Sequence, residues 1–503
     1  MNTFSGIIEG FQVAFSFEGI LFVAIGVLIG TAIGIMPGLG PITAIAVMIP
    51  ITYGMEPVFA LVMMAGVYYG AIFGSSTSSI LLNTPGAAST VATTFDGYPM
   101  AQKGQAGKAL AIAAVASFVG GTVAALFLML FAPLLAQLAV TFGPPEYFAL
   151  MLLGIIAITS FSEGSSIRAY ISAILGFMIV TIGIDSQTGT KRFTFGEVNL
   201  LEGIDFLVIA LGLFALAEVT QLIKNRSDNS LQNMSNIGSI KLTKKDIKEM
   251  AGPMSRHSIL GFVIGVLPGA GATIASFMSY VAEKGLSKRP KEFGRGSIKG
   301  LTAPETSTNA ASTGSFVPLL SLGIPGSGTT AVLLGAFLVL GVQPGPLLMS
   351  ENPSVFWGII ASMYLGNIIL IILNLPLIPY IAKLLKIPRP LLISLILTFC
   401  VVGVYSVSFS TFDLYLLLFF GVIGVIMKGL KFPAAPFILA FILGGLMEQN
   451  FRMELTISDG DVSIFFHNPV VLSFLGITIL ALLVPVVRKK WTKKHYIDES
   501  ETM

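Results

Sequence analysis

Long apolar segments recur along the whole chain. A membrane-spanning helix needs about 20 consecutive, mostly apolar residues. Segments of this kind lie at 18–36, 56–73, 109–140, 167–184, 203–221, 354–374, 412–427 and 468–487. The alternating segments of about 10 residues that are typical of outer-membrane barrels do not occur. The pattern predicts an all-α polytopic membrane protein with about 11–13 helical membrane segments, re-entrant or broken-helix hairpins included.

Pro-Gly interruptions break the apolar pattern twice in each half of the chain, in the same order. Residues 34–40 (GIMPGLG) parallel residues 265–271 (GVLPGAG), and residues 74–86 parallel residues 314–326. Paired interruptions of this kind are typical of secondary transporters, where they mark the binding site near the middle of the bilayer. We therefore expect two structurally related repeats.

Segment 257–282 carries one of these interruptions between two basic flanks, so it must enter and leave on the same side. Each arm has about 12 residues, or about 18 Å of helix, which is short of the roughly 30 Å hydrocarbon core. A re-entrant hairpin fits these lengths. The first half begins without a basic flank and the second half begins from one. The two repeats are therefore expected to be inverted.

Five successive segments are expected on this basis. They are a first membrane repeat at 1–221 with breaks at Pro37 and Pro85, a basic cytoplasmic linker at 222–256, a second repeat at 257–387 with breaks at Pro268 and Pro325, C-terminal membrane helices at 388–487, and a basic cytoplasmic tail at 488–503.

Composition and charge agree with a membrane location. The chain has 503 residues, 54% of them hydrophobic and 11% charged, whereas about 25% are charged in soluble domains. No Lys or Arg precedes Lys103, and basic residues gather at 222–256, 283–299 and 488–494. The positive-inside rule places these clusters, and with them the C-terminus, in the cytoplasm. We favour this topological interpretation over a ligand site, and the clusters lack the base-reading groups of a nucleic-acid surface.

The sequence around the breaks is polar but uncharged. Glycine allows close approach to the backbone, and a helix that restarts after Pro-Gly presents free N–H groups and a positive dipole end. Such a neutral cradle suits an anion that must bind and leave, although small residues also serve helix packing. The candidate substrate-binding residues are Gly38, Gly40, Thr43, Ser75, Asn83, Thr84, Gly86, Ser89, Thr90, Gly269, Gly271, Thr273, Asn309, Gly326, Ser327, Thr329 and Thr330.

Two carboxylates are candidates for coupling to an ion, because buried charge in a membrane is costly and usually functional. Glu305 precedes the second hairpin, and its alternative role is to cap or orient a helix start. Asp96 follows the first hairpin, and its alternative role is to form a turn before Gly97.

The sequence contains little evidence for an enzyme. The scattered histidines and the single cysteine, Cys400, argue against a metal site, and a single cysteine excludes an intrachain disulfide. The serines of residues 74–79 have no histidine in a plausible partnering motif, and no Walker motif is present. The N-terminus lacks the features of a cleaved signal peptide. We expect a non-enzyme that is driven by an ion gradient or by another subunit.

Patterned stretches along the chain resemble the large integral-membrane subunit of the tripartite tricarboxylate transporters. The resemblance runs from about residue 15 to about residue 470. The stretches that carry it are 34–41, 82–90, 95–100, 104–108, 188–196, 303–305, 309–311, 322–330 and 343–346.

This resemblance implies a translocation subunit in the bacterial inner membrane that works with a small four-span membrane subunit and an extracytoplasmic substrate-binding protein. It further implies uptake of citrate or related tri- or dicarboxylates, driven by an H⁺ or Na⁺ gradient and without an organic cofactor. Thr308 and Ser76 depart from the family's usual residues, which leaves the substrate open. The oligomeric state is open as well. The alternatives are the same architecture carrying another small metabolite, and a membrane scaffold or sensor in which the hairpins only pack.

Overall fold

The computed structural model describes residues 3–36, 38–162, 165–185, 187–224, 238–375 and 389–483. Five expected features lie wholly or partly outside the described residues. They are the break at Pro37, part of the linker at 222–256, the end of the second repeat, the ends of the C-terminal segment at 388–487, and the tail at 488–503.

Helices long and apolar enough to cross a membrane dominate the described residues. Nine reach that length, at Phe17–Gly34, Pro57–Leu82, Ala88–Ala139, Pro144–Phe161, Phe206–Lys224, Pro353–Asn374, Pro390–Ser408, Thr411–Gly429 and Ala434–Ile457. Four shorter apolar helices accompany them, at Pro41–Thr52, Ser166–Val180, Gly328–Val339 and Pro469–Leu483. The expected all-α polytopic class is confirmed.

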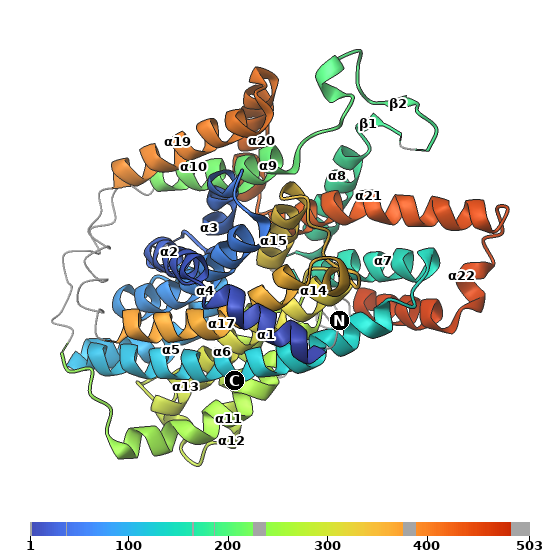
Figure 1. Cartoon of the computed structure of the whole chain (residues 1–503). Coiled ribbons are helices and arrows are strands. Elements are labelled where there is room, and N and C mark those ends of the chain that lie inside the picture. The colour runs from blue at the N-terminus through green and yellow to red at the C-terminus, as the bar shows by residue number, and fades with distance from the viewer. Residues whose placement is uncertain are drawn as a thin grey trace, which may run out of the picture. The chain divides into compact units, whose positions relative to one another are not determined.

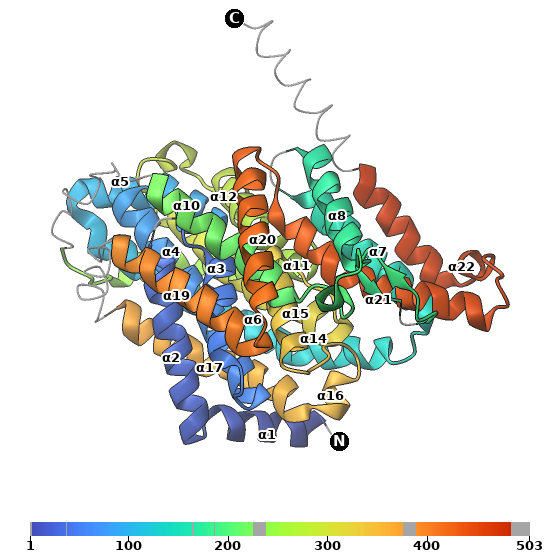
Figure 2. The same cartoon turned by 90° about the horizontal axis from the view of Figure 1, so that it is seen from above.

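The chain divides into two compact units, whose helices are drawn in Figures 1 and 2. The first comprises residues 1–140 and 206–425 and contains both pairs of interruptions. Its elements are α1 (Thr3–Ala14), α2 (Phe17–Gly34), α3 (Pro41–Met48), η1 (Pro50–Thr52), α4 (Pro57–Leu82), η2 (Ala88–Thr90), α5 (Val91–Met100), the π-helical η3 (Ala101–Gln105), α6 (Ala106–Ala139), α9 (Phe206–Ala210), the π-helical η5 (Leu211–Leu216), α10 (Ala217–Lys224), α11 (Lys244–Val266), α12 (Gly271–Leu286), η7 (Pro290–Glu292), α13 (Ile298–Gly314), α14 (Phe316–Leu322), α15 (Gly328–Val339), α16 (Leu348–Glu351), α17 (Pro353–Asn374), α19 (Arg389–Ser408) and most of α20 (Thr411–Gly429).

Residues with positive φ produce the breaks. Gly38 and Gly269 have φ of 86° and 83°, and each precedes a restarting helix. Asn83 and Gly323 have φ of 55° and 70°, and they end α4 and α14 respectively. A left-handed residue at a helix end is a common stop signal that glycine or asparagine accommodates best. The same backbone conformation therefore occurs at corresponding positions of both halves.

Glycines let the helices of each half approach to backbone contact. A Cβ on Gly34 of α2 would overlap the carbonyl oxygen of Ala71 on α4, and a Cβ on Gly265 of α11 would overlap that of Ala311 on α13. Small residues permit such close packing between membrane helices. The pairs α2–α4 and α11–α13 are thus packed through corresponding glycines, and both pairs make extensive contact.

The two interruptions within each half also meet. In the second half, the Gly269 N–H donates to the carbonyl oxygen of Gly326 at 3.0 Å, and a Cβ on Gly326 would lie 3.0 Å from the carbonyl oxygen of Gly265. In the first half, a Cβ on Gly86 would overlap the carbonyl oxygen of Gly34. Each half therefore folds its second break back onto the end of its first broken helix.

Helix α11 begins at Lys244, inside the segment that was expected to be a linker. Thr243 caps it, because its Oγ1 accepts from the Asp246 N–H at 3.3 Å and the Asp246 carboxylate accepts from the Thr243 N–H at 2.9 Å. This reciprocal capping box fixes the helix start. The first arm of the second hairpin is therefore longer than the charge pattern indicates.

The second unit comprises residues 141–205 and 426–503. Its described elements are α7 (Pro144–Phe161), α8 (Ser166–Val180), β1 (Gly183–Ile184), β2 (Lys191–Arg192), η4 (Val198–Leu200), the end of α20, α21 (Ala434–Ile457), α22 (Ile464–His467) and the helix Pro469–Leu483. The two strands pair antiparallel, with Gly183 opposite Arg192. Helix α21 packs against both α7 and α8.

An ion-pair network attaches the β1–β2 hairpin to α21. Arg452 lies 2.8 Å from both Asp185 and Glu448, and Arg192 lies 2.7 Å from Glu448. The Asp185 carboxylate also accepts backbone N–H groups of Gln187 and Thr188 at 2.9 Å. These hydrogen bonds, with the nearby Arg452, lower the pKa of Asp185 to about 2.

Gly265→Leu should destabilise the first unit, because the added side chain has no space against the α13 backbone. Overpacking of this kind costs about 1–3 kcal/mol, so we expect a lower thermal unfolding temperature of the detergent-purified protein. Gly285→Leu is the matched control, since a Cβ on Gly285 meets nothing within 4 Å. Equal unfolding temperatures for the two variants would contradict the packing described for α11 and α13.

The Asp185 network should stabilise the second unit in a pH-dependent manner. A carboxylate whose pKa is lowered by folding stabilises the protein above its usual pKa of about 3.9. That contribution is lost as the pH falls from about 4 towards 2. Asp185→Asn should therefore unfold at a lower temperature than wild type at pH 7, and thermal scans at decreasing pH should show the gap closing. Asp459 is exposed, so Asp459→Asn should unfold at the same temperature as wild type. A difference in unfolding temperature between Asp185→Asn and wild type that stays the same at every pH would refute the linkage.

Candidate functional site

Two helices restart at the breaks without a side-chain cap on their first turn. Helix α3 follows Gly40 and helix α12 follows Ala270, and neither residue before the helix offers a side-chain cap. Helix α15 differs, because Ser327 caps it by accepting from the Thr330 N–H at 3.3 Å. Uncapped N-termini retain unsatisfied donors and a partial positive charge. The starts of α3 and α12 are thus the strongest neutral anion-binding features among the predicted positions.

The first-half candidates gather around the break at 83–90. Gly40 and Gly86 are neighbours, since a Cβ on Gly40 would lie 3.4 Å from the Gly86 carbonyl oxygen. Ser75 is adjacent to Gly86, and the Ser79 hydroxyl donates to the Thr90 hydroxyl at 2.9 Å.

Asn83 and Thr84 lie within the same break. Asn83 is exposed, and the buried Thr84 hydroxyl has no hydrogen-bond partner among the described residues. Buried hydroxyls without a partner are rare in folded proteins and call for an explanation. An unpaired donor beside the break is available to a polar ligand.

The second-half candidates form a corresponding group. Gly269 bonds to Gly326, and a Cβ on Gly271 would lie 3.5 Å from the Ser327 side chain. Asn309 is less available than expected, because its amide nitrogen donates to the Glu305 carbonyl oxygen of its own helix at 3.1 Å.

Three predicted threonines lie on helices that begin at a break. Their hydroxyls make no hydrogen bond to another described residue. They are Thr43 of α3, Thr273 of α12 and Thr329 of α15.

Each half places its broken segment against the other half. Helix α3 of the first half packs on α15 of the second, and α12 of the second half packs on η2 of the first. The Thr308 hydroxyl also donates across the halves, to the carbonyl oxygen of Ser89 at 3.3 Å. The contacts are reciprocal, so one region of the first unit collects the breaks of both halves.

Asp96 acts as an anchor in this structure. One of its carboxylate oxygens accepts the backbone N–H groups of Gly294, Gly296 and Ser297 at 3.0, 2.8 and 2.7 Å. The other accepts the Tyr280 hydroxyl at 3.1 Å. Three backbone donors on one oxygen fix the turn that starts α13. This geometry gives Asp96 a structural role. The turn expected before Gly97 does not form, because Asp96 and Gly97 lie inside α5 (Val91–Met100), and the turn that Asp96 holds is the distant one at residues 294–297.

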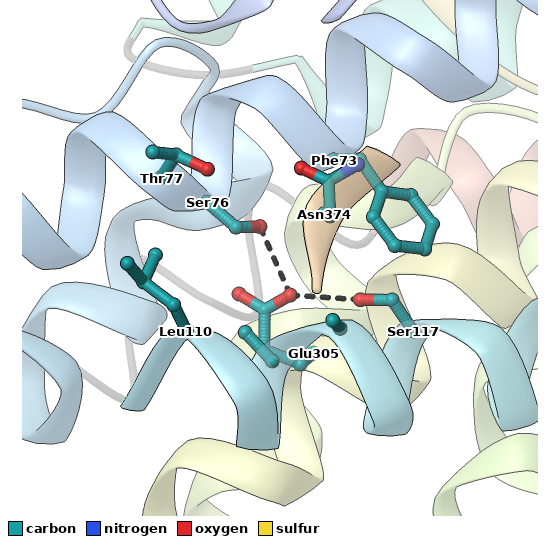
Figure 3. A pocket seen from close by; sticks show the side chains of 9 residues that line it. Phe73, Ser76, Thr77, Leu110, Ser117, Glu305 and Asn374 are labelled. Carbon is teal, nitrogen blue, oxygen red and sulfur yellow. Dashed lines mark hydrogen bonds between the residues drawn. The ribbon is translucent and has the colours of Figure 1, made fainter. Parts of the chain in front are cut away.

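Glu305 lies fully buried where four helices meet. Its Oε2 accepts the hydroxyls of Ser76 and Ser117 at 2.9 and 3.0 Å, and its Oε1 accepts the hydroxyl of Thr93. These donors come from α4, α6 and α5 respectively, while Glu305 belongs to α13. Figure 3 shows the carboxylate between Ser76 and Ser117. Every donor is neutral, so the described residues supply no counter-charge.

Sequence reasoning missed several polar residues around the site. Ser117 and Thr93 hold Glu305, and Glu218 lies next to the first break, where a Cβ on Gly38 would be 3.1 Å from its carboxylate. The Tyr68 hydroxyl lies among serines of the second half. Glu218 and Tyr68 interrupt otherwise apolar segments, and this was the available signal.

The fold and the site together define a polytopic helical membrane transport protein whose candidate site is built from interrupted helices. The chain belongs to the tripartite tricarboxylate transporter TctA family, whose pattern matches residues 20–439. The resemblance found in the sequence is thereby confirmed.

Two relatives come from Agrobacterium vitis. An uncharacterized 52.8 kDa protein in the TAR-I ttuC' 3' region is 44% identical over 502 residues, which are 99% of this chain and 100% of that protein. An uncharacterized protein in the TAR-II ttuC' 3' region is 44% identical over 233 residues, which are 46% of this chain and 96% of that protein. No solved structure matches the chain.

Asp96→Ala should destabilise the protein by about 2 kcal/mol or more, because it removes a charged acceptor from buried donors. We expect lower thermal stability and faster proteolysis within residues 290–297. Glu292→Gln is the control, since its exposed pair with Arg289 contributes little. An Asp96→Ala protein with unchanged stability and proteolysis would rule out the anchoring role.

Proposed function

We propose that this chain forms the path by which small carboxylates, tricarboxylates in particular, cross the bacterial inner membrane. The observation that supports this most directly is the reciprocal packing of the breaks, α3 on α15 and α12 on η2. Irregular backbone is tolerated at membrane depth only where protein or a watery cavity surrounds it. The uncapped starts of α3 and α12 would then provide donors for a carboxylate without a fixed cation that would hold it.

The two halves are, in this proposal, inverted repeats that bind the substrate between them. The corresponding glycines at α2–α4 and α11–α13 support a common origin of the two halves, and so do the matching positive-φ residues. Inverted repeats allow one half to move against the other around a fixed site, which is how alternating access is usually achieved.

The transport system would contain two further subunits. The family is tripartite by name, and we assign the other parts to a small four-span membrane subunit and an extracytoplasmic substrate-binding protein. An H⁺ or Na⁺ gradient would drive uptake, with Glu305 as the coupling carboxylate. We assign the C-terminus to the cytoplasm, which the basic clusters support through the positive-inside rule.

Uptake of labelled citrate into proteoliposomes tests the proposal, with both partner subunits supplied and pH and Na⁺ gradients imposed separately. Gly40→Val should reduce uptake at least about tenfold, because a side chain would enter the break and displace the anion. The backbone at Gly40 is extended (φ −81°), so valine causes no backbone strain.

Gly429→Val is the matched control, because a Cβ there meets nothing within 4 Å. Wild-type uptake by a folded Gly40→Val protein would remove the breaks from the substrate path. Uptake of another metabolite in place of all tested carboxylates would keep the architecture and change the substrate. No uptake of any solute by the complete system would favour a scaffold or sensor.

A further inference from the structure

A small cavity lies beside the Glu305 carboxylate (Figure 3). Its volume is about 10 Å³, and its polar lining consists of Ser76, Thr77, Ser117, Glu305 and Asn374. A cavity of this size holds about one water molecule or one small ion. It is too small for a tricarboxylate, so any ligand here is distinct from the transported anion.

The charge of Glu305 requires compensation. The side chain is 0% exposed, and among the described residues its partners are the hydroxyls of Ser76, Thr93 and Ser117. Hydroxyl donors reduce the cost of burying a carboxylate but leave its charge in place. A proton or a bound cation is therefore needed at this position in the membrane.

The cavity favours a bound cation over a proton. A proton would neutralise Glu305 without any use for extra volume or for a further oxygen ligand. The cavity, however, brings a carboxylate together with hydroxyls and the Asn374 side chain. The Asn374 amide nitrogen donates to the Leu370 carbonyl oxygen at 2.9 Å, which leaves the amide oxygen as a potential ligand.

The chemistry of the candidate ligands also limits the type and the charge of the cation that can bind. All the candidate donors are oxygens, which bind hard cations and not the softer transition metals. Hydroxyl groups can turn from donating to the carboxylate to presenting a lone pair to a cation. One carboxylate balances one positive charge, whereas a divalent ion would leave a net charge buried in a low-dielectric interior.

We propose that Glu305, Ser76, Ser117 and Asn374 bind one Na⁺ ion in this cavity. The site deepens the proposed function, on which its role as the coupling site rests, and it names the ion. Na⁺ binding itself does not depend on what the chain transports.

The cavity is connected directly to the break at 83–90. Ser75 and Ser76 are consecutive on α4, and Ser75 touches Gly86 while Ser76 bonds Glu305. On the following segment, Thr90 bonds Ser79 and Thr93 bonds Glu305. An ion that fixes Ser76 directly, and Thr93 through Glu305, therefore fixes both sides of the break at 83–90. Ion occupancy would in this way order the backbone that we assign to the substrate.

Thermal unfolding of the purified full chain in detergent tests the site. NaCl, KCl and choline chloride are compared at constant ionic strength and pH 7.5. We expect Na⁺ alone to raise the unfolding temperature saturably, since a ligand that binds only the folded state stabilises it. Ser117→Ala should need about tenfold more Na⁺ for half of the effect, and Glu305→Gln should lose the effect.

Ser362→Ala is the matched control, because Ser362 is equally buried but bonds only its own helix backbone. Its response to Na⁺ should equal that of wild type. If Glu305→Gln does not fold, Ser76→Ala and Ser117→Ala decide the question. An equal response to K⁺, or an unchanged Na⁺ response in these variants, would overturn the proposal. Na⁺ stabilisation without any carboxylate uptake would instead refute the proposed function and leave the ion site intact.

Discussion

Irregular backbone inside a bilayer must find its hydrogen-bond partners within the protein, and the first unit depends on how this is achieved. Each break is held by another break, as when the Gly269 N–H donates to the Gly326 carbonyl oxygen. The approach is close enough only because glycines on α2 and α11 touch the backbones of α4 and α13. The donors left over at the starts of α3 and α12 are those that an anion could use.

The carboxylates of the first unit lie at defined positions relative to the breaks. The starts of α3 and α12 carry no fixed cation, although the Glu218 carboxylate lies beside Gly38 at the break at 34–40. The Glu305 carboxylate is bound by Ser76 of α4 and Thr93 of α5 and forms a separate site. Their connection through Ser75 and Ser76 would still let the occupancy of one site influence the other.

Much of the fold follows from local patterns. Apolar length predicts α2, α4, α6 and α17, because any helix that spans a bilayer must cover about 30 Å with apolar residues. The breaks follow from Pro and Gly, whose backbone preferences act locally. The start of α11 at Lys244 was missed because the basic residues around it indicated a linker, although Thr243 and Asp246 form a recognisable capping box.

The sequence alone determined the membrane class, the family and the positions of the breaks, since each depends on composition or short-range chemistry. The tertiary structure decided how the two candidate carboxylates differ. Asp96 and Glu305 look alike in sequence. The Asp96 carboxylate accepts backbone N–H groups from residues 294–297. The Glu305 carboxylate accepts hydroxyls from three other helices and lies beside a cavity. Those partners are distant along the chain, and only packing could bring them together.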